Sequence, residues 1–172
     1  MHLKWLLIAA SLGWEGKVHF THNPPRKSGG SEGAIHFAPG RVRLEEPTPA
    51  GLAVVIWDGK KLVLLFPEKK TFMEMPAAQA ALSTAPPLDL GGMTEAGRES
   101  IDGQECTIYE RKGADVTQRL WVPADAKKKK LFFFLREATI TPRGATRADV
   151  SDVRFRAQPD ALFQVPRDFA KK

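Results

Sequence analysis

The sequence predicts a mainly β (α+β) domain built from an antiparallel meander of strands. The strongest observation is at residues 52–67, where Asp58-Gly59 separates two short apolar, β-branched runs. Asp-Gly between such runs is a strong hairpin signal, because both residues tolerate the positive φ of a type I′ turn. Similar short runs, separated by Gly, Pro and Asp-Gly turns, fill most of the chain, whereas residues 76–82 are the best helix candidate.

Both strands of the predicted hairpin are apolar on both faces. A strand that is half exposed alternates apolar with polar residues, and residues 52–57 and 62–66 do not. Each strand must therefore be covered on two sides or line an apolar cavity. This pattern indicates a binding module and suggests no chemistry.

The other elements follow in order along the chain. Alternation places Trp14, Val18 and Phe20 on the buried side of the first strand. Further strands are expected at residues 33–37, 41–45, 71–75, 99–101, 105–111, 117–123 and 149–156, with turns at 39–40, 102–103 and 142–144. Residues 83–92 are expected to form a linker, and residues 159–166 an extended tail.

Residues 124–138 are ambiguous between strand and helix. Many of them are helix formers, but three consecutive phenylalanines and the following Thr139-Ile140-Thr141 favour a strand at residues 131–135. That run would again be apolar on both faces.

Composition limits the function classes. The chain has 172 residues and a formal net charge of +6, which suits one globular domain and a cationic surface. The dense basic run, residues 127–130, has no interleaved aromatic residues, and no recognition-helix pattern is present. We therefore expect no nucleic-acid partner; the run either meets anionic lipid headgroups or is an exposed turn, and we expect the turn.

The N-terminus is typical of a targeting segment. A short basic start, Met1 to Lys4, precedes an apolar stretch, Trp5 to Ala10, that ends in small residues. It is far shorter than the roughly 20 residues of a transmembrane helix. We expect residues 1–13 to be an export signal at the lower limit of length, residues 14–172 to be the domain, and the protein to be periplasmic or otherwise exported. The alternative is a first buried strand.

No catalytic or metal-binding constellation stands out. Cys106 is the single cysteine, and all four histidines lie between residues 2 and 36, so no thiol–imidazole pair is expected. His19, His22 and His36 could hold zinc, but His19 and His36 alternate with inward apolar residues and are expected to face solvent. The acidic cluster of Glu95, Glu99, Asp102 and Glu105 falls at turns and strand edges. We expect no enzyme, no cofactor and no metal.

The order of motifs resembles that of exported bacterial domains of unknown function 4412. The residues that carry this resemblance are Gly40–Leu44, Ile56–Leu62 with its "D-G-K" turn, Pro67–Phe72, Gly103–Tyr109, Trp121–Asp125 and Pro159–Pro166. Each motif is short, so the resemblance rests on the order in which the motifs follow one another from residue 40 to residue 166.

That family is in turn similar to the periplasmic lipoprotein carriers of the LolA/LolB type. The resemblance implies a curved antiparallel sheet that forms an open half-barrel, with the helix at residues 76–82 as a lid over an apolar cavity. This chain lacks the carriers' long N-terminal helix, so the resemblance implies their fold but not their carrier activity.

The expected function is that of a non-enzymatic, monomeric envelope protein that binds an apolar ligand in the concave face. The ligand would be a lipid or the acyl chains of a lipoprotein, and the cavity candidates are Trp57, Phe66, Phe72, Trp121 and Phe133. The alternative is that these aromatic residues fill a solid core. The protein would then be an interaction or sensor module that contacts an envelope protein through an edge strand or loop.

Overall fold

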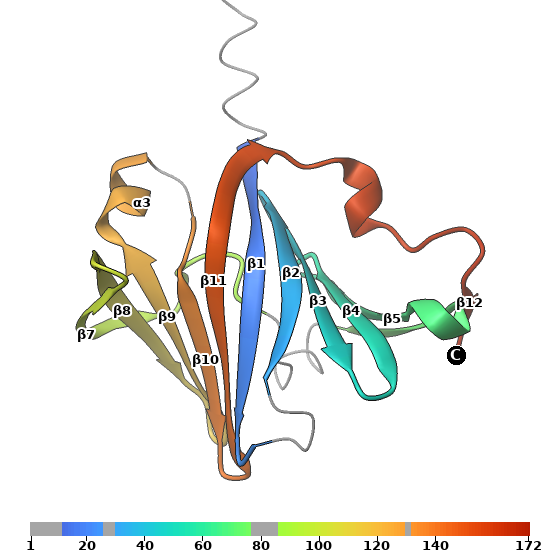
Figure 1. Ribbon diagram of the computed structural model, residues 1–172, viewed down its shortest axis with the longest axis horizontal. Coiled ribbons are helices and arrows are strands. Elements are labelled where there is room, and N and C mark those ends of the chain that lie inside the picture. Colours follow the sequence, from blue (N-terminus) through green and yellow to red (C-terminus); the bar gives the residue numbers. More distant parts are fainter. Residues whose placement is uncertain (1–11, 26–29, 77–85, 130–131) are drawn as a thin grey trace, which may run out of the picture. The chain divides into compact units, whose positions relative to one another are not determined.

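A computed structural model describes residues 12–25, 30–76, 86–129 and 132–172. These residues are mostly β and form one open sheet in the order β12-β6-β5-β4-β3-β2-β1-β11-β10-β9-β8-β7 (Figure 1). The pairings from β2 to β6 and from β7 to β11 are antiparallel, whereas β12 pairs with β6 in parallel. The predicted mainly β, antiparallel fold is confirmed.

The strands are β1 (Leu12–Asn23), β2 (Ser31–Ala38), β3 (Arg41–Thr48), β4 (Gly51–Trp57), β5 (Lys61–Phe66), β6 (Thr71–Pro76), β7 (Thr94–Ile101), β8 (Gln104–Lys112), β9 (Thr117–Pro123), β10 (Arg136–Thr141), β11 (Gly144–Ala157) and β12 (Ala170–Lys171). One α-helix, α3 (Ala124–Lys129), and two 3-10 turns, η1 (Pro67–Lys69) and η2 (Asp160–Phe163), complete the described elements.

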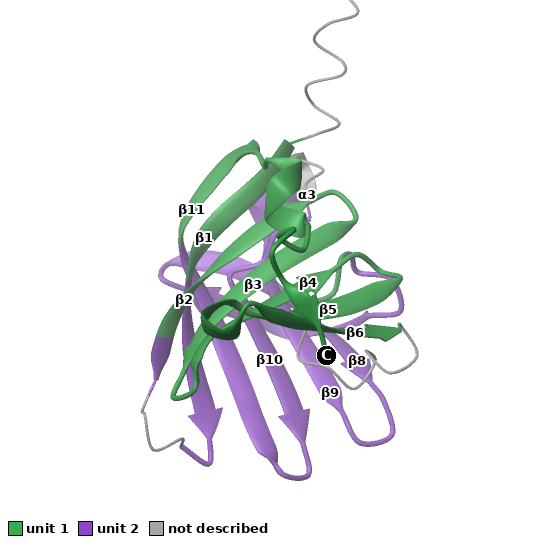
Figure 2. Cartoon of the chain, turned by 90° about the vertical axis from the view of Figure 1, so that its right-hand side faces the viewer, with its two compact units in different colours: residues 1–17, 32–88, 152–172 green, residues 18–31, 89–151 purple. Residues whose placement is uncertain are grey.

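The chain divides into two compact units (Figure 2). Unit 1 comprises residues 1–17, 32–88 and 152–172, and unit 2 comprises residues 18–31 and 89–151. Strands β2 to β6 and β12 belong to unit 1, apart from Ser31 at the start of β2, and β7 to β10 belong to unit 2. Strands β1 and β11 contribute residues to both units.

The predicted hairpin is confirmed as β4–β5, but its turn is not of type I′. That turn type needs a positive φ at both central residues; Gly59 has a φ of 80°, whereas Asp58 is not among the residues with positive φ. Trp57 pairs with Leu62, which leaves four residues in the loop. The Asp58 carboxylate closes that loop by accepting 2.9 Å hydrogen bonds from the backbone N–H groups of Lys60 and Lys61.

A two-residue turn with both φ angles positive occurs instead at Asp102-Gly103. Their φ values are 49° and 79°, and the flanking residues Ile101 and Gln104 pair directly. The turn expected at residues 102–103 is therefore confirmed, and its two positive φ values are those of type I′. At Asp58 the side-chain hydrogen bonds favour a wider loop.

Two predictions for the second half of the chain were wrong. Residues 132–135 form an irregular segment before β10 rather than a strand, yet Phe133 and Phe134 are 6% and 1% exposed. These side chains are buried although their backbone is not part of a strand, so their burial did not require sheet hydrogen bonds. Residues 159–166 are not uniformly extended, because η2 begins directly after Pro159.

Several predictions lie wholly or partly outside the described residues. They concern the export signal up to residue 11, the helix beyond Pro76 and residue 130 of the lysine run; Pro76 itself ends β6. The described part of the lysine run, residues 127–129, belongs to helix α3 and not to the expected turn. No helix of the described residues is both long and apolar enough to cross a membrane.

Candidate functional site

The strands of unit 1 present two faces of different character. Cross-strand pairing defines two rows on one side, which we call face A: Ile35–Leu44–Val55–Leu64–Met73 and Phe37–Val42–Trp57–Leu62–Met75. All ten side chains are apolar. Because neighbouring residues of a strand point to opposite sides, the intervening residues form face B.

Face A becomes less buried toward β6. Ile35 and Val42 on β2 and β3 are 1% and 0% exposed, whereas Met73 on β6 is 39% exposed. Trp57 lies between these limits and packs with Leu62. The ten residues of face A therefore form an apolar surface whose edge reaches solvent, and the indole of Trp57 is the one hydrogen-bonding side-chain group among them.

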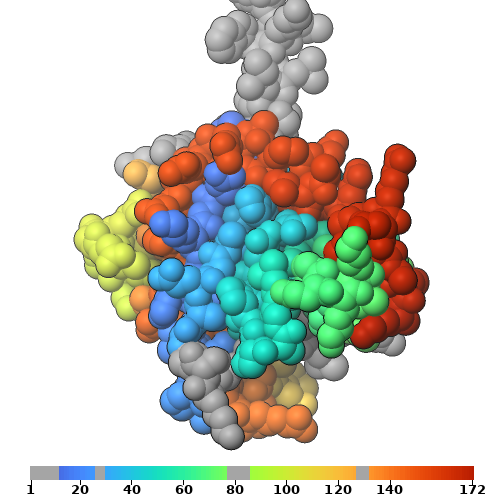
Figure 3. Space-filling view, turned by 45° about the vertical axis from the view of Figure 1, so that its right-hand side comes forward, coloured from blue at the N-terminus to red at the C-terminus, as the bar shows by residue number. Residues whose placement is uncertain are grey.

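Face B is closed by the chain's own C-terminus. Val54, Ile56, Val63 and Leu65 are 0–4% exposed because Phe163, Val165 and Phe169 pack against them, together with Leu52 and Phe72. We call residues 158–172 the C-terminal strap. In Figure 3 this segment, in red, lies against η1 and β6, in green.

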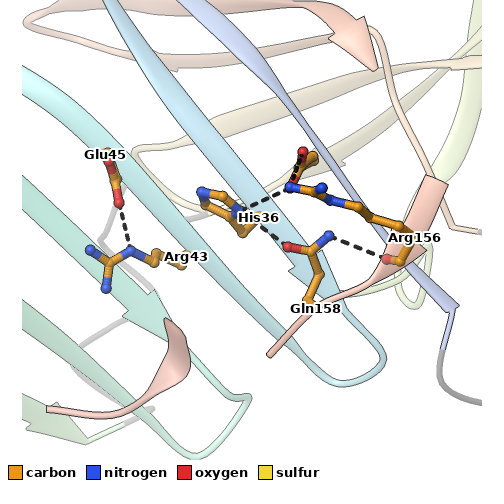
Figure 4. Close-up of polar contacts among 6 residues, drawn as sticks. His36, Arg43, Glu45, Arg156 and Gln158 are labelled. Carbon is orange, nitrogen blue, oxygen red and sulfur yellow. Dashed lines mark hydrogen bonds and ion pairs between the residues drawn. The ribbon is translucent and has the colours of Figure 1, made fainter. Parts of the chain in front are cut away.

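The remainder of face B is polar. Gln158 of the strap accepts a 3.1 Å hydrogen bond at Oε1 from Nδ1 of His36, and Arg43 is paired with Glu45 at 2.7 Å (Figure 4). Arg43 also donates to the backbone carbonyl of Leu162. His36 was expected to face solvent; that expectation was wrong, because the strap covers this side of β2.

The five predicted cavity residues do not share one face. Trp57 lies on face A, and Phe72 lies on face B under the strap. Phe66 lies on the same side of β5 as Leu64, but it is at the strand end, paired with the polar Thr71 and with the Lys172 ammonium 5.6 Å from its ring. Phe133 is a buried residue of the irregular segment in unit 2.

Trp121 has a polar setting in unit 2. Its indole Nε1 donates a 2.7 Å hydrogen bond to Glu99, and the Arg136 guanidinium lies 5.5 Å from its ring. It packs with Ile101 and Cys106, whereas its neighbours Leu120 and Val122 point to the other side of β9. Among the predicted residues, Trp57 thus remains the candidate with an apolar face around it.

Sequence reasoning missed a polar row in unit 2 whose members Gln118, Glu137 and Thr139 are buried. Arg111 donates a 2.6 Å hydrogen bond to the Gln118 side chain, and Gln118 donates one of 2.8 Å to Glu137. Thr139 also donates to Glu137, at 3.4 Å. Burial raises the pKa of Glu137 to about 7, although the hydrogen bonds from Gln118 and Thr139 oppose this shift.

The only sequence signal for this row is alternation. Glu137 follows Arg136 and looks like surface charge, but it shares a strand face with Thr139, and its residue is 4% exposed. Only the pairing of Glu137 with Leu120 reveals that this side of β10 is buried.

The chain matches a known family over most of its length. The model of the family described as domain of unknown function DUF4412 matches residues 14–140, well over half of the chain. The chain belongs to the DUF4412 family. No curated protein sequence matches it.

Solved structures with TM-scores above 0.5 share the fold of this DUF4412 protein. An uncharacterized conserved protein from Thermus thermophilus has a TM-score of 0.60 at 11% identity, covering 95% of this chain and 91% of that chain. PNGF-II has a TM-score of 0.52 at 11% identity, covering 94% of this chain and 31% of that chain. The lipoprotein LppX from Mycobacterium tuberculosis has a TM-score of 0.41 at 13% identity, covering 88% of this chain and 89% of that chain.

Nucleophile and metal chemistry find little support in the described part of this DUF4412 protein. Cys106 is buried, and burial raises the pKa of its thiol, which disfavours the reactive thiolate. His22 is hydrogen-bonded to Thr146 and His36 to Gln158. Within residues 12–25, 30–76, 86–129 and 132–172, no three His, Cys, Asp or Glu side chains are grouped for a metal ion.

Proposed function

We propose that this DUF4412 protein is an exported, non-enzymatic envelope protein that binds an apolar ligand on face A of unit 1. The ligand class is a lipid or the acyl chain of a lipoprotein. The single observation that carries the proposal is that only one of the two apolar faces of β4–β5 is covered by the C-terminal strap. Face B is sealed by the C-terminal strap, whereas face A remains apolar up to Met73, which is 39% exposed.

The chemistry of face A supports an acyl chain over a polar ligand. Its two rows contain no hydrogen-bonding side chain except the indole of Trp57. Met73 and Met75 line its outer end, and flexible thioether side chains adapt to ligands of irregular shape. Burial of ten methylene groups would contribute about 8 kcal/mol before the costs of ordering the chain.

Export is the second part of the proposal. It rests on the basic and apolar pattern of residues 1–13 and on the resemblance of the motifs to exported domains. The acyl ligand suits this location, because an envelope protein works between membranes that supply lipid.

The experiment that tests ligand binding starts from protein purified from the periplasm. Native mass spectrometry, followed by organic extraction, should find a lipid bound at a stoichiometry near one. Delipidated protein should take the same lipid class up again in a saturable way. A protein that leaves the periplasm free of lipid and takes up none would contradict the proposal.

One observation favours a second candidate, the interaction module. β7 is the last strand of the sheet, and its residues 94–100 are all exposed. An exposed edge strand can pair with an extended peptide of a partner. A bulge between Glu95 and Gly97 interrupts this edge, and bulges protect edges from unwanted pairing. Crosslinking from position 98 to neighbouring proteins in the cell envelope would distinguish the two functions. A specific crosslinked protein is expected for the interaction module, whereas a lipid binder needs no protein at this edge.

A further inference from the structure

The C-terminal strap is held in the way that a bound peptide is held. It crosses face B of unit 1 from β2 to β6, beginning at the Gln158–His36 hydrogen bond. At its far end, the N–H groups of Ala170 and Lys172 donate 2.9 Å hydrogen bonds to the carbonyls of Lys70 and Phe72. This pairing adds one short parallel strand to the edge of β6, which is the way extended peptides add to sheets.

The strap's anchors are few, and its ion pairs are exposed. After Gln158, no residue of the strap is fully buried; Phe163, Val165 and Phe169 are half-buried. Asp168 is paired with Lys70 and Lys171 with Glu74, and the side chains of Asp168 and Lys171 are 58% and 59% exposed. Exposed pairs of this kind contribute about 0–1 kcal/mol each.

The surface beneath the strap, in contrast, is apolar and deeply buried. Val54, Ile56, Val63 and Leu65 are 0–4% exposed and would be bared if the strap left. Simple release is therefore unfavourable, because apolar surface would return to water. Exchange for another segment of the same pattern would conserve that burial and cost little.

We infer that face B of unit 1 is a docking site for an extended segment of a partner protein, and that residues 158–172 occupy it as an internal ligand. The partner segment presents apolar side chains at the spacing of Phe163, Val165 and Phe169. It carries an acidic residue that faces Lys70 and a basic residue that faces Glu74. This inference is independent of lipid binding, which concerns face A.

Charge complementarity selects such a segment. Arg41 is paired with Asp160 and lies 4.5 Å above the ring of Phe163, so the β3 end of face B accepts an acidic residue and an aromatic residue. Glu74 at the other end accepts two lysines, Lys61 and Lys171. Face B therefore offers Arg41 on β3 to an acidic residue, and at the β6 end it offers Lys70 to an acidic residue and Glu74 to a basic residue. This order sets the direction of the bound segment.

The test uses the full-length chain and a fluorescein-labelled synthetic peptide of residues 158–172. The double variant Phe163→Ser/Phe169→Ser loosens the strap, and the matched control Gln164→Ser/Arg167→Ser changes exposed strap residues. We expect saturable binding of the peptide, followed by fluorescence anisotropy, to the loosened variant. Affinity should be at least tenfold lower for the control variant, and tenfold lower for a peptide that carries the two Ser substitutions.

A loosened variant that keeps its circular dichroism spectrum and does not bind the peptide would overturn the inference. Equal binding of the native-sequence and Ser-substituted peptides would overturn it as well. Hydrogen exchange on the unmodified chain tests it without any variant. The amides of Ala170 and Lys172 should exchange at least tenfold faster than that of Val54, and equal protection would show that the strap opens only when the protein unfolds.

Discussion

Gln118 donates a 2.8 Å hydrogen bond to Glu137, a carboxyl group that burial brings to a pKa of about 7. An ionised Glu137 carboxylate would accept hydrogen bonds from two neutral groups, the Gln118 amide and the Thr139 hydroxyl. The Arg111 guanidinium donates its hydrogen bond to Gln118, one residue away from Glu137 in the row. Burial therefore makes the folded protein prefer the protonated form. This relationship makes the stability of unit 2 depend on pH.

The first prediction is that Glu137 weakens the fold as pH rises. Its pKa is 4.5 as an unperturbed group and about 7 when folded, so its contribution is complete below pH 4.5 and is lost as pH rises through 7. Relative to wild type, Glu137→Gln should gain about 3 kcal/mol of unfolding free energy across this window. Chemical denaturation of both proteins from pH 4 to pH 8 measures it. A constant difference between them would contradict the assigned pKa.

The second prediction concerns the β4–β5 turn. Gly59 has a φ of 80°, and a Cβ at this position would lie 3.4 Å from Cδ1 of Leu88. Gly59→Val should cost at least about 1 kcal/mol of unfolding free energy through backbone strain. Gly59→Asn is the matched control and should cost less, because Asn tolerates positive φ. Equal denaturation midpoints for Gly59→Val and wild type would exclude this strain.

The third prediction concerns the strap. Phe163 packs on the apolar residues of face B and lies under the Arg41 guanidinium. Phe163→Ala should lower the unfolding free energy by about 1–3 kcal/mol, since packing and the cation–π contact are both lost. Gln164→Ala changes the adjacent exposed residue and should leave the thermal midpoint unchanged. Similar effects of the two substitutions would show that the strap does not seal face B.

The fourth prediction concerns export. If residues 1–13 are a signal, the native protein should fractionate with the periplasm and begin near Trp14. N-terminal sequencing of protein isolated from the native host decides this. A sequence that begins at Met1 would make residues 5–8 part of the mature protein.

Much of the fold could be predicted, because local patterns determine it. Alternation located β1 and its buried Trp14, and Asp-Gly dipeptides located two hairpins. The limits come from tertiary packing. Phe133 and Phe134 are buried without being in a strand, and the Asp58 side chain widens a turn that its dipeptide predicts to be tight.

The site was harder to predict than the fold, because the cover over a strand is not local. Residues 52–66 require cover on both faces, but nothing in them reveals that one cover comes from Phe163 and Phe169, about a hundred positions later. For the same reason Phe72 and Trp57 looked equivalent, although pairing across β4, β5 and β6 places them on opposite faces. Glu137 was hidden because burial of a charged residue depends on its neighbours across the sheet.

Binding of an acyl ligand on face A is the central claim, and one matched pair of variants tests it most directly. Met73 on face A and Ile140 in unit 2 are 39% and 37% exposed, so replacing each by Lys makes a similar chemical change at a similar exposure. Both lysines can extend toward water, so folding should be retained. The measurement is a titration with a long-chain fatty acid below its micelle concentration, followed by intrinsic tryptophan fluorescence. We predict saturable binding to wild type and Ile140→Lys, and binding at least tenfold weaker to Met73→Lys; equal affinities of the two variants, or no saturable response from folded wild type, would contradict the claim.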